Sequence, residues 1–274
     1  MRYHQYRRAG LNALNRFLGL FGWKLGRHNL APHDYVSAKL YNDLVNEIQG
    51  YYTAYVVPTY SPTPERTELL CKLLGTNISE ALYLLHCLHE SAHLEGDICE
   101  FGIAQGATSA LLANELGSSR KNLWLFDSFQ GLSKPTEKDV LIHDISNVGS
   151  MEGYEGSMAV PITQVQRRLS EIHFPSERVK IVPGFIEKTL QSSNLPQRVS
   201  VAYVDFDFYE PIAMALQFLD RALVSGGFII IDDYGFFSAG AKTAVDEFYD
   251  AKRDSYIMLN VPKYAGHFAI LQKR

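Results

Sequence analysis

The sequence has few of the features that mark specialised classes of protein. Its three cysteines (Cys71, Cys87 and Cys99) are odd in number and lack the spacing of a zinc site, which favours a reduced, cytoplasmic setting. No apolar run approaches the roughly 18 residues of a membrane-spanning helix. The net charge of −4 does not favour a nucleic-acid partner. No internal repeat is evident, so we expect an ordinary globular protein whose 274 residues can bury a sizeable core.

The N-terminal segment, residues 1–33, has no acidic side chain but carries six lysines and arginines. Its apolar residues recur at helical spacing, at Leu11, Leu14, Leu18, Phe21 and Leu25. A basic amphipathic helix of this kind can lie on a membrane surface or on an acidic partner. We favour the alternative, a helical arm that packs on the core or on a second subunit. Because charges interrupt the apolar stretch, a cleaved signal peptide is not expected.

The rest of the chain divides into a helical part and an alternating part. Helices are expected over residues 34–55, 65–74 and 79–94, the last with Ser79 as its N-cap. From residue 97, strands alternate with helices; strands are expected at 97–104, 122–127, 179–182, 199–205, 228–232, 257–261 and 268–271. This alternation indicates an α/β fold with a parallel sheet and helices on both faces, closed by an antiparallel pair. We expect a helical arm and cap over 1–95 and the main domain over 96–274.

A glycine-containing turn follows the first expected strand. It lacks the G-x-G-x-x-G fingerprint, yet Gly102 and Gly106 still allow a ligand to approach the backbone closely. Asp127 ends the second strand, 21 residues after Gly106 (127 − 106), where an acid can accept both hydroxyls of a ribose. The alternative is a turn needed only for packing, with Asp127 capping the next turn. Together these features favour a nucleoside site.

Four aspartates stand at the ends of two strongly apolar strands. Asp205 and Asp207 follow one strand, and Asp232 and Asp233 follow the next. Aspartate is a poor strand residue, and an unpaired buried carboxylate is unfavourable. Because the carboxyl ends of neighbouring strands meet at the ligand-binding edge of an α/β sheet, the aspartates predict a divalent cation, for which Mg²⁺ is the best match. In the alternative interpretation, Asp207 caps the following helix and Asp233 turns the chain.

Residues 60–274 resemble the macrocin-type O-methyltransferases, the TylF, MycF and NovP group. The resembling segments are residues 61–66 (SPTPER), 96–102 (GDICEFG), 126–132 (FDSFQGL), 205–210 (DFDFYE), 232–235 (DDYG) and 242–248 (KTAVDEF). One departure lies in the first turn, where the family commonly carries Trp-Arg-Gly-Gly and this chain has Ala-Gln-Gly-Ala at 104–107. Contacts to a methionine carboxylate are therefore expected to differ.

The resemblance implies the class I, Rossmann-like methyltransferase fold, with a mostly parallel seven-stranded sheet, an antiparallel C-terminal strand and an N-terminal helical extension. It implies S-adenosylmethionine as cofactor and a homo-oligomer, dimer or higher. Residues near the methionine and ribose would be Glu100, Gly102, Gly106 and Ser109. Asp127 would hold the ribose hydroxyls, and Ser128 and Gln130 would lie near the adenine and ribose. Thr63 or Ser61 would close over the methionine end.

The resemblance also implies that Asp205, Asp232 and Asp233 hold Mg²⁺. Asp207 would then act as general base on the hydroxyl of a sugar or glycosylated natural product. A catechol or phenol acceptor, a metal-dependent hydrolase and a catalytically silent binding module remain alternatives. Specificity is expected in a long polar lid, residues 133–161. We assign no role to His143 or His267.

Overall fold

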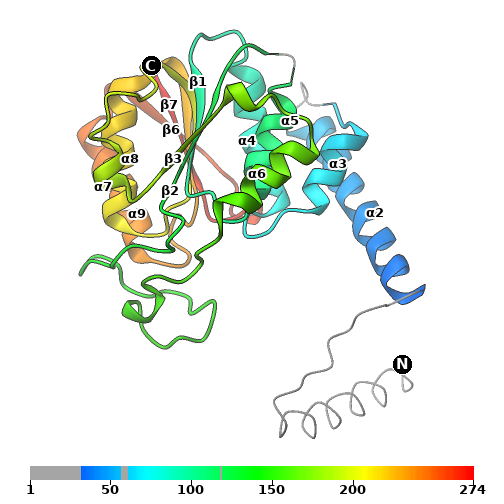
Figure 1. The fold of residues 1–274 in the computed structure, drawn as a ribbon, viewed down its shortest axis with the longest axis horizontal. Coiled ribbons are helices and arrows are strands. Elements are labelled where there is room, and N and C mark those ends of the chain that lie inside the picture. The colour runs from blue at the N-terminus through cyan, green and yellow to red at the C-terminus, as the bar shows by residue number, and fades with distance from the viewer. Residues whose placement is uncertain (1–31, 57–60, 118) are drawn as a thin grey trace, which may run out of the picture. The chain divides into compact units, whose positions relative to one another are not determined.

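A computed structural model describes residues 32–56, 61–117 and 119–274, and for residues 32–42 and 264 the backbone alone (Figure 1). The predicted basic N-terminal segment therefore lies almost entirely outside the described residues. The chain separates into two compact units, Met1–Asp43 and Leu44–Arg274. The second holds the whole sheet, while the predicted boundary at residue 95 stays a prediction. In the described part of the chain, no helix has the length and apolar character needed to cross a membrane.

Three helices precede the sheet: α2 (Pro32–Tyr55), α3 (Pro64–Cys71) and α4 (Ile78–Glu90). Thr63 is the N-cap of α3, and its hydroxyl accepts a hydrogen bond from the Arg66 N–H. The expected cap of α4 was wrong, because Ser79 already lies inside the first turn. Asn77 caps that helix instead, and its side chain accepts the Glu80 N–H at 2.9 Å. Asparagine is among the best N-cap residues, since its short side chain reaches the first free amides.

The sheet has seven strands in the order β3-β2-β1-β4-β5-β7-β6. Their bounds are β1 Asp97–Phe101, β2 Leu123–Asp127, β3 Val179–Pro183, β4 Val199–Val204, β5 Leu223–Ile231, β6 Tyr256–Leu259 and β7 Ala269–Lys273. β1 to β5 pair in parallel, whereas β7 is antiparallel to both β5 and β6. The predicted fold class is confirmed. The strand order reverses between β1 and β4, which is where ligand crevices open in such sheets.

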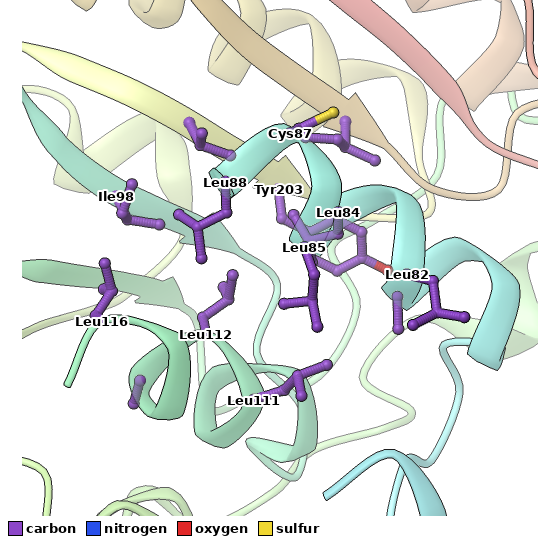
Figure 2. Close-up of a cluster of buried hydrophobic side chains, with 14 of the residues drawn as sticks. Leu82, Leu84, Leu85, Cys87, Leu88, Ile98, Leu111, Leu112, Leu116 and Tyr203 are labelled. Atoms are coloured by element: carbon purple, nitrogen blue, oxygen red, sulfur yellow. The ribbon is translucent and has the colours of Figure 1, made fainter. Parts of the chain in front are cut away.

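Helices cover both faces of the sheet (Figure 1). Those that follow β1 are α5 (Ala107–Glu115), α6 (Ile162–Glu171), α7 (Ile186–Thr189), α8 (Tyr209–Ala222) and α9 (Ala239–Ala251), with short 3₁₀ turns η1 (Glu152–Tyr154), η2 (Ser176–Arg178) and η3 (Lys263–Ala265). One buried cluster joins α4, α5 and α6 to the sheet, and a second joins α7, α8 and α9. Figure 2 shows Leu85 and Leu88 of α4 facing Leu111 and Leu112 of α5. Because alternate strand residues enter opposite clusters, the strands are apolar throughout.

The segment between β2 and α6 has little regular structure, as expected for residues 133–161, and η1 is its single helical turn in the described chain. It is nevertheless anchored. The buried carboxylate of Asp139 accepts hydrogen bonds from the Tyr209 N–H at 2.7 Å and the Ser238 hydroxyl at 3.0 Å. Tyr154 is buried among aromatic side chains that include Phe208 and Phe237. The segment is thus fastened at the starts of α8 and α9, the helices that follow the acidic strand ends.

Candidate functional site

A cavity of about 680 Å³ opens at the carboxyl ends of the central strands. The strand ends contribute Gly102, Asp127, Ser128, Asp205, Asp207, Asp232 and Asp233 to its lining. The segment 133–161 contributes Ser133, Lys134, Ile145, Met158, Ala159 and Val160, and the end of β3 leads into Gly184 and Phe185 and the first residues of α7, Ile186 and Glu187. The cavity therefore brings the predicted nucleoside turn and the acidic strand ends into one space. Its volume falls in the range of ordinary small-molecule sites.

Two glycines shape the turn between β1 and α5. Gly102 has a φ of 84°, and a side chain at this position would overlap the backbone of Asp205. Gly106, with a φ of 76°, is the N-cap of α5, and a Cβ there would press on Val165. Both positions combine a left-handed backbone with close packing, so glycine is required at both. Gly102 lines the cavity, whereas Gly106 is not part of its lining.

Asp127 lies in the cavity but is already engaged by the protein. One carboxylate oxygen accepts the N–H groups of Ile103 at 2.7 Å and Ala104 at 3.2 Å, and the other accepts the Phe129 N–H at 2.6 Å. A carboxylate has about four lone-pair positions, so one remains for a ligand. Asp127 thus holds the β1–α5 turn in shape and can also contact a hydroxyl group. The predicted role in turn formation and the predicted role in ligand binding are compatible.

Of the other predicted cofactor residues, one lines the cavity and the rest do not. Ser128 lines it, and its hydroxyl donates to the Gly131 carbonyl at 2.8 Å. Glu100 is buried beneath the turn and accepts a hydrogen bond from Ser109. Burial raises the pKa of Glu100 to about 8, with a smaller contribution from Asp127 and an opposing one from the Ser109 hydrogen bond. The structure does not bring Glu100, Gly106, Ser109, Gln130 or Thr63 to the cavity wall, so their roles stay predictions.

The loop before α3 is held by Arg66. Its guanidinium group binds the Ser61 carbonyl and forms a buried ion pair with Glu115 of α5. Thr63 is used as the cap of α3. Both predicted closing residues, Ser61 and Thr63, therefore have structural partners. Their contact with a methionine group stays a prediction.

The acidic strand ends meet because β4 and β5 are neighbours, with Val204 opposite Ile231. Asp207 and Asp233 each adopt a left-handed backbone, with φ of 62° and 54°. That conformation is uncommon for residues other than glycine and clusters at functional sites. The alternative in which Asp207 caps the next helix is wrong, because Phe208 occupies the N-cap position of α8. The other half of that alternative, in which Asp233 turns the chain, agrees with the left-handed backbone of Asp233.

Three of the four aspartates form a close group. Asp205, Asp207 and Asp233 present carboxylate oxygens within 4.8 Å of one another, the one such group among the residues that the structure describes. Burial raises the pKa of Asp207 to about 6, although a hydrogen bond from Asp233 opposes the shift. Burial and repulsion by Asp207 and Asp232 raise the pKa of Asp233 to about 10. The raised pKa values mean that protons neutralise part of the negative charge of these carboxylates. A bound cation would neutralise that charge more effectively.

Asp232 is held differently. The Tyr203 hydroxyl donates to one oxygen at 2.8 Å, and the Asp233 N–H donates to the other at 2.7 Å. Glu80 of α4 lies near that hydroxyl group as well, with a carboxylate oxygen 3.3 Å from it. Asp232 lines the cavity, but it lies outside the close group of three. Sequence patterns gave no indication of Glu80, because nothing local in α4 points to a partner in the sheet.

The donor set fits a hard divalent cation. All four side chains offer carboxylate oxygens, which Mg²⁺ prefers. The cavity lining described here contains Lys134 as its single lysine, arginine or histidine, against seven carboxylic acids (Asp127, Glu187, Asp205, Asp207, Glu210, Asp232 and Asp233). The five aspartates are half-buried and the two glutamates are exposed, and half-buried negative charge in this excess is unfavourable without a counter-ion. His143 and His267, left unassigned from sequence, both lie beside the Phe236 ring, with ring centroids 5.0 Å and 4.8 Å from it.

Comparisons with known proteins agree with this geometry. The family model of the macrocin O-methyltransferases (TylF) matches residues 83–268. The 8-demethyl-8-(2,3-dimethoxy-alpha-L-rhamnosyl)-tetracenomycin-C 4'-O-methyltransferase of Streptomyces olivaceus is 30% identical over 162 residues, 58% of this chain and 57% of that protein. The mycinamicin III 3''-O-methyltransferase of Micromonospora griseorubida is 28% identical over 174 residues, 61% of this chain and 66% of that protein. The match thus spans less than two thirds of the length of these relatives.

The fold has a solved counterpart in the O-methyltransferase NovP. The two structures superpose with a TM-score of 0.63 at 22% sequence identity, over 86% of this chain and 99% of NovP. At this level of identity the likeness concerns the fold. It supports the assignment of the seven-stranded sheet to the class I methyltransferase architecture.

Proposed function

The chain belongs to the macrocin O-methyltransferase family, and we propose that it transfers a methyl group from S-adenosylmethionine to a hydroxyl of a sugar or glycosylated natural product. The observation that carries the proposal is the meeting of Gly102, Asp127 and four aspartates in one cavity. A donor site and an acceptor site must adjoin for an in-line transfer. Relatives that act on rhamnosyl tetracenomycin and on mycinamicin support a glycoside acceptor.

The donor half of the cavity is the turn after β1. Here S-adenosylmethionine would supply an electrophilic methyl group on its sulfonium sulfur. The absence of a side chain at Gly102, which lines the cavity, lets the turn pack against Asp205 and leaves its backbone open to the donor. The remaining lone pair of Asp127 would accept a ribose hydroxyl, and Phe185 and Ile186 offer apolar surface for the adenine. Seven acids also favour the positive charge of the sulfonium.

The acceptor half is the acidic group. We propose that Asp205, Asp232 and Asp233 hold Mg²⁺, which lowers the pKa of a bound hydroxyl when present. Asp207 accepts the hydroxyl proton. A base must lie within hydrogen-bond reach of that proton, and the closeness of Asp207 to Asp205 and Asp233 supports this role. The acceptor oxygen then forms the new bond to the methyl carbon as the carbon–sulfur bond breaks, and S-adenosylhomocysteine leaves.

The charge of the cavity bears on the acceptor. Phosphate groups would meet seven carboxylic acids and a single lysine, Lys134, so a neutral glycoside is favoured over a nucleotide-linked sugar. Exposed apolar side chains of the segment 133–161 extend the cavity mouth. Ile145 and Met158 line the cavity while remaining 46% and 43% exposed. They offer an apolar aglycone a surface beside the reacting sugar.

We further propose that the protein is a homo-oligomer. On α2, Leu44, Tyr51 and Tyr55 are 54%, 51% and 78% exposed, and their spacing puts them on one side of the helix. Such side chains are suited to an interface with a second copy. Light scattering of the full chain would measure its mass. A cytoplasmic location also stays a proposal, supported by three free cysteines in the described chain.

Calorimetry tests the enzymatic proposal directly. We expect S-adenosylmethionine to bind and Mg²⁺ to bind separately, because their residues occupy different halves of the cavity. Asp205→Asn should weaken Mg²⁺ binding and spare S-adenosylmethionine. The matched control is Asp220→Asn, since Asp220 pairs with Lys252 away from the cavity.

Failure of S-adenosylmethionine to bind at millimolar concentration would contradict methyl transfer and favour the metal-dependent hydrolase. If S-adenosylmethionine does bind, neutral glycosides and catechols, offered separately as acceptors, distinguish the two acceptor classes. Formation of S-adenosylhomocysteine is the readout. Turnover confined to catechols would contradict the glycoside assignment.

A further inference from the structure

A buried polar network lies under the acidic strand ends, on the α4 side of the sheet. Its centre is Tyr203 of β4, which Figure 2 shows beneath the leucines of α4. The Tyr203 hydroxyl lies 2.8 Å from Asp232, 3.3 Å from Glu80 and 3.3 Å from Thr76. Tyr203 and Glu80 are each 1% exposed. The mechanism proposed above uses neither side chain.

The network has an apparent explanation that fails. Asn77 and Glu80 have the spacing of a capping box, in which the glutamate bonds back to the helix start. A capping box would bring the Glu80 carboxylate to the Asn77 backbone N–H, whereas its contact with Asn77 here is to the side-chain amide, at a long 3.5 Å. Glu80 instead extends into the protein, where its carboxylate lies 3.3 Å from the Tyr203 hydroxyl that donates to Asp232. A buried carboxyl group of this kind requires a reason beyond helix capping.

The geometry fixes the orientation of Asp232. One of its oxygens is held by Tyr203 and the other by its neighbour's backbone N–H. A tyrosine hydroxyl has a single hydrogen to donate, and the shortest of its three contacts is to Asp232. Each carboxylate oxygen of Asp232 retains lone pairs, and the residue lines the cavity. The network therefore restrains this side chain without consuming its capacity to bind an ion.

We propose that Tyr203 and Glu80 are positioning residues for Asp232, so that helix α4 helps to build the cation site. The inference rests on the proposed function, because it assumes that Asp232 binds the ion. Glu80 precedes the segment matched by the family model, which begins at residue 83. The cation site thus depends on a side chain more than a hundred residues away from its nearest aspartate in sequence.

The principal variants are Tyr203→Phe, Glu80→Ala and Glu80→Gln in the full chain. Mg²⁺ and Mn²⁺ affinities are measured by calorimetry in the absence of acceptor. Partners that orient metal ligands typically contribute about 10–100-fold in metal affinity. We expect Tyr203→Phe and Glu80→Ala each to lower the affinity for both ions about 10-fold. Glu80→Gln keeps a hydrogen-bonding group at the same length and should stay within about threefold of the parent.

The matched control is Tyr256→Phe. Tyr256 is also fully buried, and its hydroxyl also contacts an aspartate, Asp220, at 3.2 Å, but it lies outside the cavity lining. The variant Tyr256→Phe should be less stable than the parent protein but should keep the parental affinity for metal ions. S-adenosylmethionine affinity and thermal unfolding, measured for every variant, separate a local effect from a general one. If Tyr203→Phe fails to fold, the difference in metal affinity between Glu80→Ala and Glu80→Gln tests the positioning role.

The outcomes are distinguishable. If the parent protein binds neither Mg²⁺ nor Mn²⁺, the proposed cation site is wrong and the inference falls with it. If the parent binds both ions and Tyr203→Phe and Glu80→Ala match the Tyr256→Phe control, the cation site stands and the positioning role is wrong. If Glu80→Gln loses as much affinity as Glu80→Ala, Glu80 acts through its charge, which also contradicts the positioning role.

Discussion

Gly102 lies so close to Asp205 that a Cβ atom on the glycine would stand 1.7 Å from the aspartate's backbone carbonyl oxygen. The two residues directly follow adjacent parallel strands, β1 and β4, at the point where the strand order reverses. Gly102 lines the donor half of the cavity and Asp205 the acidic half. Their contact therefore sets the separation between the proposed methyl donor and the proposed cation.

We expect Gly102→Ala to disrupt both halves of the site. The left-handed backbone alone should reduce the free energy of unfolding by about 1–2 kcal/mol, and overpacking against a backbone atom should add about 1–3 kcal/mol. The matched control is Gly149→Ala, because Gly149 has a similar φ of 92° but open space around it. Urea denaturation measures the difference. Equal losses in the two variants would show that the Asp205 contact is unimportant.

Substitutions of Asp207 and of Asp205 should differ in their effects on kcat and on the affinity for Mg²⁺. Asp207→Asn removes the proposed base and should lower kcat by about 10²–10⁴-fold, with little change in the affinity for S-adenosylmethionine. Asp205→Asn should also lower the affinity for Mg²⁺. Steady-state kinetics and calorimetry on both variants measure this. A large loss of Mg²⁺ affinity in Asp207→Asn would make Asp207 a cation ligand and leave the base to be found elsewhere.

The ion pair of Arg66 with Glu115 should make stability depend on pH. Burial acts to raise the pKa of Glu115, but hydrogen bonds from His89 and Arg66 outweigh it and lower the pKa from 4.5 to about 2. A depressed pKa contributes stability that is fully present above the unfolded value and is lost as pH falls from about 4.5 towards 2.

Glu115→Gln should therefore flatten the stability profile between pH 4.5 and about 2 relative to the parent. Glu68→Gln is the control, because Glu68 forms an exposed pair with Lys72 within α3 and its C-cap, and such pairs contribute little. Chemical denaturation at several pH values gives the profile. An unchanged slope in Glu115→Gln would contradict the assignment.

Asp139 should control how firmly the segment 133–161 is held. Its carboxylate accepts the Tyr209 N–H and the Ser238 hydroxyl, and a Cβ on Gly240 would lie 1.9 Å from one of its oxygens. Asp139→Ala leaves these donors unpaired, which should reduce the free energy of unfolding by about 1–3 kcal/mol. In limited proteolysis, Asp139→Ala should be cut within residues 133–161 faster than the parent protein. The control variant is Asp250→Ala, which removes an exposed ion pair with Arg253. It should be cut at the parental rate.

Much of the site follows from local sequence patterns. Apolar runs alternating with helical segments predict the parallel sheet, because a strand buried on both faces must be apolar throughout. The carboxyl ends of parallel strands meet at one edge, so the convergence of Asp205 with Asp233 is predictable from their places after two strands. The resemblance to macrocin-type methyltransferases added the family, which the match over residues 83–268 confirms.

The partners of those residues could not be predicted from local patterns. Glu80 contacts Tyr203, the partner of Asp232, across 123 residues of sequence, and no periodicity in α4 encodes such a contact. Asn77 rather than Ser79 caps α4, since the end of a helix depends on the backbone around it. Asp127 gives most of its capacity to neighbouring N–H groups, which is visible only when the turn is folded.

The sequence by itself determined the kind of fold, the family and the residues that carry charge, because these depend on residue type and spacing along the chain. The tertiary structure decided how the charges are shared. It grouped Asp207 with Asp205 and Asp233, tied Asp232 to Tyr203, and set Gly102 against Asp205. The reason is physical: hydrogen bonds and steric contacts act over a few ångströms between segments that only the packed sheet and its helices bring together.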